Sequence, residues 1–507
     1  MNAGSYTERL KARSLFAFHR QNSRRTAMTY ETRMDVEEGA VFSAAPATSD
    51  PSMTIQDAFF MCLDEMLSHA ATKNLGPTRC TRTLYLWFAT VAGAYNWVTA
   101  SNVATGVQDD WNWGIHHRLF TAEDQRRWMC HVFAHIMPVF IDGYNPEKFT
   151  RGELDSVEWN KVRDAGAWFA WAAAWRTWYT GHGAAHLSPA VLPNGTIGLD
   201  VGSTVDPATY PHPTKWTPLI IRPKKQTYLT YNWHDVKSAR LTTEQETTLE
   251  DVGSAEFPTD AARAIEIADL LALTQTLTDT QKVIAEFWAG GPGTVSPPGM
   301  FIWFWKEYMI CTHVSAFPTL FYSGLDLAAH LFETSRVVWG LKRKFMQARP
   351  IQEIRRLHRD EVITHYDGTT RLGAAWVPYQ TANFVTPPFA DYPSGHSAFG
   401  RSFANVMTHW FGPTIAATPT RTMTDAGLIC PVFIGAAVRE SFARFTFPAG
   451  ASEIQGGVVP AAPVRLEWTT WREMADSCGV SRQYGGIHAA SAHTGSVAVA
   501  DALHGML

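Results

Sequence analysis

Residues 324–350 read GLDLAAHLFETSRVVWGLKRKFMQARP, and this stretch sets the first element of the fold. Its apolar residues recur at helical spacing and Pro350 cannot continue a helix, so we predict a long helix over about 324–348. Lys342 and Arg349 are seven residues apart within it, which is close to two helical turns. Both side chains are therefore predicted to project from one face of this helix.

A second segment, Pro393-Ser394-Gly395-His396, stands just before an apolar pattern that predicts a helix over about 396–411. A small hydroxyl residue and a glycine at this place leave backbone N–H groups and a serine hydroxyl at the positive end of the helix dipole. The sequence therefore predicts an oxyanion cradle at the start of this helix.

A third segment lies near the C-terminus, where Ser481-Arg482 is followed after five residues by His488. Gly485 and Gly486 stand between them and make one continuous helix unfavourable. We therefore expect Arg482 on an incoming loop, and His488 at the opening of a last helix that extends to about residue 504.

The rest of the sequence is also mostly helical in pattern. Apolar residues recur at helical spacing over five more stretches, namely about 55–73, 81–100, 123–140, 260–270 and 300–313. Residues 188–225 are rich in proline and glycine and predict loops, while 444–447 and 464–468 predict a β-hairpin. We predict a mainly α protein of two helical bundles with a small β-hairpin, divided into an extended arm over 1–50, an N-terminal helical region over 51–235 and a C-terminal helical bundle over 236–507.

Charge and composition exclude several classes of protein. Lysine plus arginine number 43 against 47 aspartate plus glutamate, with no basic run, so no nucleic-acid surface is expected and any bound anion must be attracted by a local cluster. The six cysteines form no C-x-x-C pair, which argues against a zinc ribbon. No apolar run is long enough to span a membrane and no signal peptide is seen, so we expect a soluble protein, either cytoplasmic or exported by another route. The oligomeric state, including a homo-oligomer, stays open.

The three segments bring together the groups that a tetrahedral oxyanion needs. These groups are cations at Lys342, Arg349 and Arg482, neutral donors at Ser394 and Gly395, and two histidines, His396 and His488. Arginine suits bidentate contact with such an anion, and one histidine could bond to the central atom while the other exchanges protons. Each segment alone is more often a solvated helix face or a helix cap. All three in this order, with proline directly after the first arginine and directly before the serine, favour a site for phosphate or vanadate.

These motifs, K-x6-R-P, P-S-G-H and S-R-x5-H, resemble the signature of the vanadium-dependent haloperoxidases and the related acid phosphatases. Further segments are similar to the haloperoxidase branch, so that the resemblance covers about residues 210–507; they are 216–219, 226–230, 285–298 and 447–450. The resemblance implies a vanadium haloperoxidase-like fold and vanadate as cofactor, with phosphate or sulfate able to occupy the same site.

The resemblance also implies a role for each motif residue. His488 would bond vanadium through one ring nitrogen, His396 would be the acid–base group on the opposite side, and Lys342 would polarise the peroxide. The vanadate oxygens would accept hydrogen bonds from Lys342, Arg349, Ser394, Gly395 and Arg482.

The implied function is the oxidation of a halide by hydrogen peroxide to hypohalous acid, which then reacts with small organic acceptors. Bromide and iodide are expected substrates, since they are easier to oxidise than chloride. Two alternatives stay open. One is a phosphatase of the same superfamily, in which His488 attacks phosphorus and His396 protonates the leaving group. The other is an anion-binding protein without catalysis.

Two positions depart from the family pattern. Ala492 stands four residues after His488, where relatives commonly have aspartate. Gly290 stands where relatives often have an aspartate that can pair with the arginine equivalent to Arg482. Loss of such carboxylates is expected to loosen His488 or Arg482, at a typical cost of about 10–100-fold in metal affinity or activity.

Two aromatic residues bear on the choice of halide. Trp339, three residues before Lys342, and Phe389, seven before His396, resemble the aromatic pair of chloride-oxidising relatives, whereas bromide-specific ones often carry histidine or arginine there. The alternative is that both are ordinary core aromatics in a chain with 20 tryptophans and 28 phenylalanines.

Overall fold

The computed structural model of the chain describes residues 55–99, 137, 140–141, 191–314, 316–416 and 438–507. The arm predicted over 1–50 lies outside these residues, as does the helix predicted over 123–140 apart from residues 137 and 140. The predicted division into an arm and two helical regions stays a prediction.

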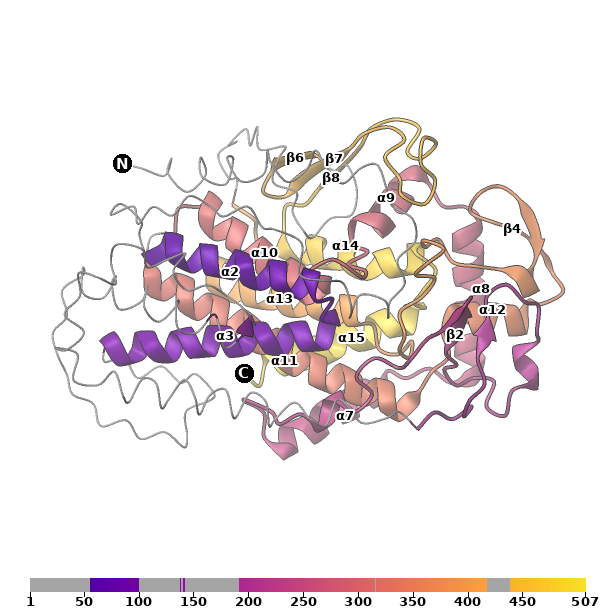
Figure 1. Ribbon diagram of the computed structural model, residues 1–507, viewed down its shortest axis with the longest axis horizontal. Coiled ribbons are helices and arrows are strands. Elements are labelled where there is room, and N and C mark those ends of the chain that lie inside the picture. The colour runs from indigo at the N-terminus through magenta and orange to yellow at the C-terminus, as the bar shows by residue number, and fades with distance from the viewer. Residues whose placement is uncertain (1–54, 100–136, 138–139, 142–190, 315, 417–437) are drawn as a thin grey trace.

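The described part is an elongated body in which a set of helices runs alongside one another (Figure 1). These are α2 (Ile55–Thr72), α3 (Gly76–Thr99), α10 (Ser296–Cys311), α11 (Phe317–Phe345), α13 (Gly395–Phe411), α14 (Trp471–Tyr484) and α15 (Ala490–His504). Further helices are α7 (Thr243–Ala255), α8 (Asp260–Gln275), α9 (Asp279–Phe287) and α12 (Pro350–Leu357), with 3-10 turns at Pro207–Thr209, Trp233–Asp235 and Gly373–Ala375. The predicted mainly α class is confirmed.

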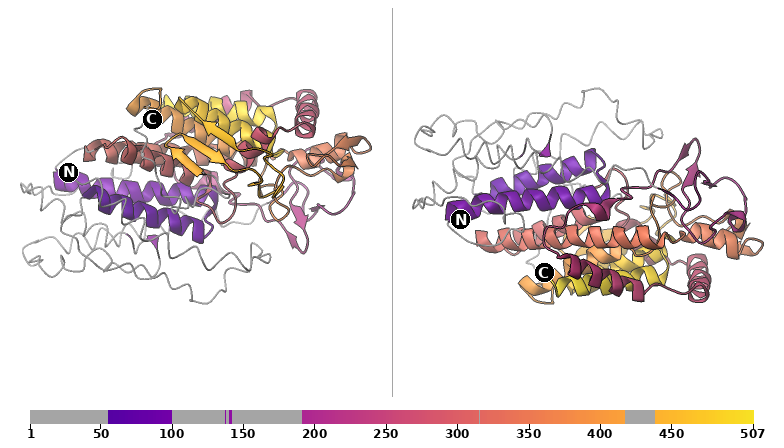
Figure 2. Two further views of the ribbon diagram at one scale, coloured as in Figure 1. Left: turned by 90° about the horizontal axis from the view of Figure 1, so that it is seen from above. Right: turned by 90° about the horizontal axis from the view of Figure 1, so that it is seen from below.

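The middle of the chain forms the central layer of the bundle. Figure 2 shows the N-terminal pair α2 and α3, in indigo, and the C-terminal helices, in yellow, on opposite sides of α10 and α11. One continuous apolar cluster joins these layers, from Phe59 and Trp87 through Trp305 to Phe403 and Trp471. The burial of so many large rings is the main favourable term that holds the layers together.

Helix α10 is buried on nearly all sides because its sequence, SPPGMFIWFWKEYMIC, is apolar around the whole helix. Its two charged side chains are paired, since Lys306 Nζ lies 2.5 Å from Asp64 and 3.1 Å from Glu307, and Glu307 accepts from Arg439 at 2.7 Å. These ion pairs tie α10 to α2 and to a strand near the C-terminus.

Among the described helices, none is both long and apolar enough to cross a membrane.

The strands are short and lie around the helices. β1 (Leu199–Asp200), β2 (Leu219–Ile221) and β3 (Lys224–Lys225) form a small sheet, β4 (Val362–Thr364) pairs with β5 (Thr370–Leu372), and β6 (Val438–Ser441), β7 (Arg444–Phe447) and β8 (Val464–Glu467) form a third. The predicted hairpin is present as the antiparallel pair β7 and β8, with β6 added at its edge. The first sheet lies within residues 188–225, where only loops were predicted.

The helix that carries Lys342 ends earlier than predicted. α11 stops at Phe345, and Met346 takes a left-handed backbone conformation with a φ of 46°. The Met346 N–H donates to the main-chain oxygen of Lys342 at 2.9 Å, which closes the last turn. A non-glycine residue in this conformation gives no sequence signal for a helix end, so the apolar pattern was extended too far.

Arg349 therefore lies beyond this helix. Gln347 pairs with Lys215 in an isolated β-bridge, and Arg349 is the N-cap residue of α12, with Pro350 at the first position of that helix. The prediction that Lys342 and Arg349 share one helix face is wrong. Pro350 opens a helix here, a position that suits its fixed φ and its missing N–H.

The third motif also differs from its prediction. Arg482 lies in the last turn of α14, whose start is fixed by a capping box at Thr470, so the prediction of a loop at Arg482 is wrong. The chain turns at Gly486, which has a φ of 67°, and His488 lies in the loop just before Ala489, the N-cap residue of α15. His488 thus precedes the last helix, where more backbone freedom is available than within it.

Candidate oxyanion site

Lys342 projects from the last turn of α11 into the protein interior, where it has no exposed surface. Its Nζ donates to the main-chain oxygens of Ala390 at 2.8 Å and Asp391 at 3.1 Å. Burial, and then the charge of Arg349, lower the pKa of Lys342 well below its usual value. Two of the three ammonium protons are thus directed at the main chain and one is left for a ligand, and a bound anion would favour the charged form.

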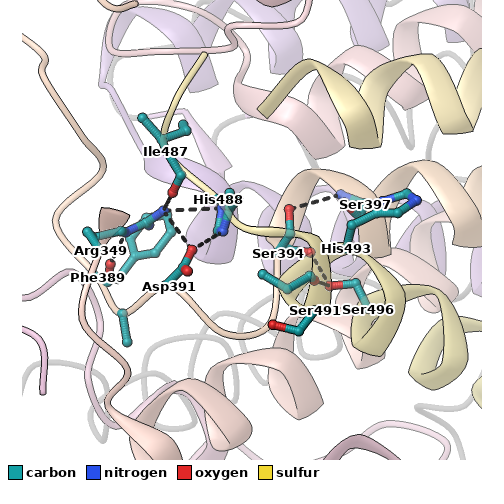
Figure 3. Close-up of polar contacts among 12 residues, drawn as sticks. Arg349, Phe389, Asp391, Ser394, Ser397, Ile487, His488, Ser491, His493 and Ser496 are labelled. Carbon is teal, nitrogen blue, oxygen red and sulfur yellow. Dashed lines mark hydrogen bonds and ion pairs between the residues drawn. The ribbon is translucent and has the colours of Figure 1, made fainter. Parts of the chain in front are cut away.

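Arg349 reaches the same region from the loop before α12 and is 2% exposed. Its Nε donates to the Phe389 oxygen at 2.7 Å, and its Nη1 faces the Ile487 oxygen at 2.8 Å and His488 Nε2 at 3.2 Å (Figure 3). Its Nη2 is buried and has no partner among the described residues. Burial lowers the pKa of Arg349 to about 10, so the group stays charged at neutral pH. A buried charged donor without a partner is costly, and Nη2 therefore suits a negatively charged ligand.

His488 stands between a carboxylate and a guanidinium. Its Nδ1 lies 2.5 Å from Asp391 Oδ1, and its Nε2 lies 3.2 Å from Arg349 Nη1 (Figure 3). The first contact is short but not well aligned for a hydrogen bond. Burial, followed by the charge of Arg349, lowers the pKa of His488 to about 3, so the ring is neutral. Because a carboxylate only accepts and a guanidinium only donates, the ring proton belongs on Nδ1 and the lone pair on Nε2.

Asp391 was not among the residues predicted from the sequence. It is fully buried in the loop that leads to α13, and its Oδ2 accepts from Arg263 Nη2 at 2.6 Å. Burial alone would raise the pKa of Asp391, but Arg263 and Arg349 outweigh it and hold the pKa below its usual range. The local signal was a single acidic residue inside an otherwise apolar stretch, Phe389-Ala-Asp-Tyr-Pro393, directly before the second motif.

The second motif forms the N-terminus of α13. Ser394 is the N-cap residue, and its Oγ accepts from the Ser397 N–H, which leaves the hydroxyl proton free to donate. The N–H groups of Gly395 and His396 have no partner in the described part of the chain. The Ser394 N–H donates to the Ala492 oxygen at 2.8 Å, which ties the second motif to the residues just after the third. Free N–H groups at the start of a helix of 17 residues favour an anion.

His396 is half-buried and is held by main-chain oxygens. Its Nε2 lies 2.9 Å from the Trp288 oxygen and 3.2 Å from the Ala289 oxygen. Since a carbonyl only accepts, Nε2 carries the ring proton and Nδ1 is the free basic nitrogen in the neutral form. Burial lowers the pKa of His396 well below its usual value, and the charge of Arg482 adds to this effect.

Arg482 approaches from α14 without a carboxylate. Its Nε donates to Ser481 Oγ at 2.9 Å and its Nη2 to the Ala285 oxygen at 2.5 Å, and no acidic group lies within 4.0 Å of it in the described part of the chain. Burial lowers the pKa of Arg482 to about 10. Gly290 has a φ of 54°, and a Cβ there would lie 3.1 Å from Pro297 Cδ. The missing aspartate at Gly290 is thus not replaced by another carboxylate at Arg482.

Trp339 and Phe389 form an apolar wall beside Lys342. Their ring centroids are 5.0 Å apart, and Lys342 Nζ lies 5.8 Å from the first and 5.0 Å from the second. The Trp339 indole N–H donates to the Leu229 oxygen at 3.1 Å, which fixes the ring. The two aromatic residues that were predicted to bear on halide choice therefore lie side by side, and both lie near Lys342.

The cluster has the character of an oxyanion site. Three buried basic side chains, Lys342, Arg349 and Arg482, belong to it, and in the described chain Asp391 is the only carboxylate within 4.0 Å of any of them. Among the described residues there is no group of three or more histidine, cysteine or acidic side chains that could hold a bare metal ion. One histidine lone pair with many N–H donors suits the central atom and the oxygens of a tetrahedral anion.

The family comparison concerns the C-terminal part of the chain. Residues 324–504 match the model of a family described as the VCPO second helical-bundle domain, and this range contains all three motifs. A search of curated proteins finds no match.

The fold is similar to that of solved vanadium enzymes. A bacterial vanadium-dependent chloroperoxidase superposes in its holo form with a TM-score of 0.58 and 14% identity over 87% of this chain and 95% of that one. Its apo form gives a TM-score of 0.54 and 13% identity over 85% and 95%. A bacterial vanadium-dependent iodoperoxidase gives 0.54 and 15% identity over 91% and 98%. At these identities the likeness shows that the fold is shared along most of the chain.

Proposed function

We infer that this chain is a vanadate-dependent haloperoxidase, which uses hydrogen peroxide to oxidise halide to hypohalous acid. Its residues 324–504 match the model of the VCPO second helical-bundle domain. One observation carries the inference. Arg349 Nη2 is a buried cationic donor that has no partner among the described residues, and it belongs to the guanidinium that faces the lone pair of His488 Nε2. Such a pair fits the oxygens and the central atom of an oxyanion.

The residues present fit vanadate by charge and by donor type. Lys342, Arg349 and Arg482 supply three positive charges for a highly charged anion, and the Ser394 hydroxyl and Gly395 N–H supply neutral donors. His488 offers Nε2 as the ligand atom. When bound, vanadate supplies a Lewis acid that activates peroxide without a change of oxidation state. Phosphate or sulfate would be held by the same donors, because they share the tetrahedral arrangement of oxygens.

Two side chains have the free atoms that proton movement requires. His396 holds its Nε2 proton against main-chain oxygens, so Nδ1 accepts and returns protons at the anion. Lys342 keeps one N–H beyond the two directed at main-chain oxygens, and in its charged form it would stabilise negative charge on an oxygen of the substrate peroxide.

Trp339 and Phe389 make the wall next to Lys342 apolar, which reduces the hydration of a halide that arrives there. We expect oxidation of bromide and iodide in any case, because they give up electrons more easily than chloride. Oxidation of chloride is the stricter test of this apolar wall. Phe389→His brings a polar ring and is expected to lower the ratio of kcat/KM for chloride to kcat/KM for bromide.

The test uses the full chain incubated with orthovanadate and freed of excess. Peroxide-dependent bromination of a phenol dye is expected with vanadate and is expected to be lost without it. Aryl phosphate hydrolysis is measured on the vanadate-free protein in parallel. Hydrolysis with no bromination at any vanadate loading would assign the site to a phosphatase. The absence of both activities would leave an anion-binding protein without catalysis.

A further inference from the structure

Asp391 connects the three motif segments through both its main chain and its side chain. Its N–H donates to the Gln347 oxygen at 3.0 Å, and its own main-chain oxygen accepts from Lys342 Nζ at 3.1 Å. Its side chain reaches His488 at 2.5 Å through Oδ1 and Arg263 at 2.6 Å through Oδ2. The carboxylate is therefore held in one orientation, with one oxygen for each partner.

Arg263 anchors this carboxylate from α8. The arginine is 6% exposed, and its Nη2 also donates to the Ala348 oxygen at 3.0 Å. A buried carboxylate without a cation would be strongly unfavourable, so Arg263 makes it possible to keep a charged Asp391 next to the histidine.

The same helix holds the His488 loop at a second point. Glu266, one turn after Arg263 in α8 and 3.7 Å from it, accepts from the Ser491 N–H at 3.2 Å and from the Ser491 hydroxyl at 2.7 Å. Glu266, Arg263 and Asp391 thus form a row of charged side chains that contact one another. This row holds His488, just before Ala489, and Ser491, two residues after it. Figure 3 shows Asp391 and Arg349 converging on His488 from the same side of its loop.

We propose that Asp391, anchored by Arg263, is the positioning residue of His488: it keeps the ring proton on Nδ1, so that the Nε2 lone pair, which faces Arg349 Nη1 at 3.2 Å, is available to the oxyanion. The inference rests on the proposed function in one respect, namely that His488 is the ligand atom of vanadate. Asp391, which lies on a different loop, would then take the role of the carboxylate that relatives commonly have at the position of Ala492. A carboxylate behind a ligating histidine fixes its orientation and increases its basicity, and its loss typically costs about 10–100-fold in metal affinity.

The first experiment needs no substitution in the ion pair. Protein labelled with ¹⁵N-histidine and free of vanadate is examined by long-range ¹H–¹⁵N correlation at pH 7.5, with His488→Gln used to assign the His488 signals. We expect the neutral tautomer with the proton on Nδ1. A proton found on Nε2 in the folded wild-type chain overturns the proposal, whatever the enzyme then does.

The second experiment measures vanadate affinity by equilibrium dialysis. We expect Asp391→Asn to weaken vanadate binding about 10–100-fold and to give a mixture of His488 tautomers. Since Asp391→Asn takes away the carboxylate nearest to Arg263, the double variant Asp391→Asn with Arg263→Gln is measured beside it, and it keeps a neutral hydrogen-bonding pair. Unchanged affinity and an unchanged tautomer in a folded variant would reject the role of Asp391.

A matched control is Asp501→Asn, which removes a carboxylate from another arginine pair, with Arg401 at 2.6 Å, on α15. We expect vanadate affinity and the His488 tautomer to stay as in the wild-type chain. An equal loss of affinity in this control would assign the effect to general destabilisation and reject the positioning role. If the wild-type chain binds no vanadate, the proposed function fails, whereas the tautomer still reports separately on Asp391.

Discussion

His488 and His396 lie on two sides of the candidate site and are held by different kinds of partner. On the His488 side, a buried carboxylate faces Nδ1, and Nε2 carries a lone pair that faces Arg349 Nη1 at 3.2 Å. On the His396 side, two main-chain oxygens face Nε2 and leave Nδ1 free. The arginines differ in the same way, because Arg349 lies 3.9 Å from Asp391, whereas within the described part of the chain Arg482 donates only to Ser481 Oγ and a main-chain oxygen.

The different partners of His488 and His396 suit the two residues to different roles, the first to binding the anion and the second to proton transfer. A carboxylate behind an imidazole increases the basicity of its lone pair, which suits a ligand of the central atom. Main-chain oxygens orient an imidazole without adding charge, which leaves a neutral group that can take up and return a proton. The two sides therefore predict different consequences for substitutions that are alike in chemistry.

The largest effect is expected from His396→Gln on the His396 side. The amide can still donate to the main-chain oxygens, but it cannot exchange protons, so kcat for bromide oxidation is expected to fall about 100- to 10,000-fold. Vanadate affinity is expected to change less than about tenfold, since His396 is not the ligand. Both values are measured on the same preparation, by steady-state kinetics and by equilibrium dialysis. A variant that retains wild-type kcat would remove His396 from the reaction.

On the His488 side, Arg349→Gln is expected to weaken vanadate binding by about 2–5 kcal/mol, or roughly 30- to 4,000-fold. The loss is large because the substitution removes Nη2, which has no partner among the described residues, and also the cation beside His488 Nε2, while Asp391 keeps Arg263. Equilibrium dialysis measures it. The control is Arg343→Gln, the same change on α11 at a side chain that pairs with Asp235 away from the site, and its affinity is expected to match the wild-type value.

A smaller effect is expected from Arg482→Gln, about 1.5–3 kcal/mol or roughly 10- to 150-fold in vanadate affinity. No carboxylate in the described chain depends on Arg482, so its removal takes away hydrogen bonds to the anion without leaving a buried negative charge. Dialysis of both arginine variants under one condition compares the two sides directly. A greater loss for Arg482→Gln than for Arg349→Gln would show that the support from Asp391 does not matter for binding.

The smallest effect concerns stability against acid in the vanadate-free protein. Histidine in the unfolded chain titrates near pH 6.5, but burial lowers the pKa of His488 to about 3 and that of His396 well below its usual value. As the pH falls from 6.5, the unfolded state binds protons that the folded state does not, so stability decreases. Each histidine contributes a slope of at most about 1.4 kcal/mol per pH unit. Urea unfolding between pH 6.5 and 4.5 is expected to show a shallower slope for His396→Gln, and an identical slope would contradict a buried neutral His396.

The sequence predicted a candidate site from three motifs, and the secondary structure that it predicted around two of the motif residues is wrong. The spacing of Lys342 and Arg349 suggested a shared helix face, but Met346 ends the helix through a left-handed conformation that no local pattern predicts. Arg482 was expected on a loop because two glycines follow it, whereas the helix continues past Arg482 and ends before them. Both arginines are nevertheless buried beside histidines of the motifs, Arg349 beside His488 and Arg482 near His396.

The role of Asp391 could not be predicted from a local sequence pattern. Its contact with His488 joins residues that are far apart in sequence, and its charge is tolerated because Arg263, from a third segment, is buried beside it and Arg349 lies 3.9 Å away. The sequence did indicate that a carboxylate was missing at Ala492. It gave no means to see that another loop supplies one, since that depends on how α8, the loop before α13 and the loop before α15 pack together.

The most direct test is a crystal structure of the full chain soaked with orthovanadate. The account predicts vanadium bonded to Nε2 of His488, with its oxygens facing Arg349 Nη2 and the Gly395 N–H. Vanadium bonded to Nδ1 of His488 or to His396, or located outside this cluster, would contradict it.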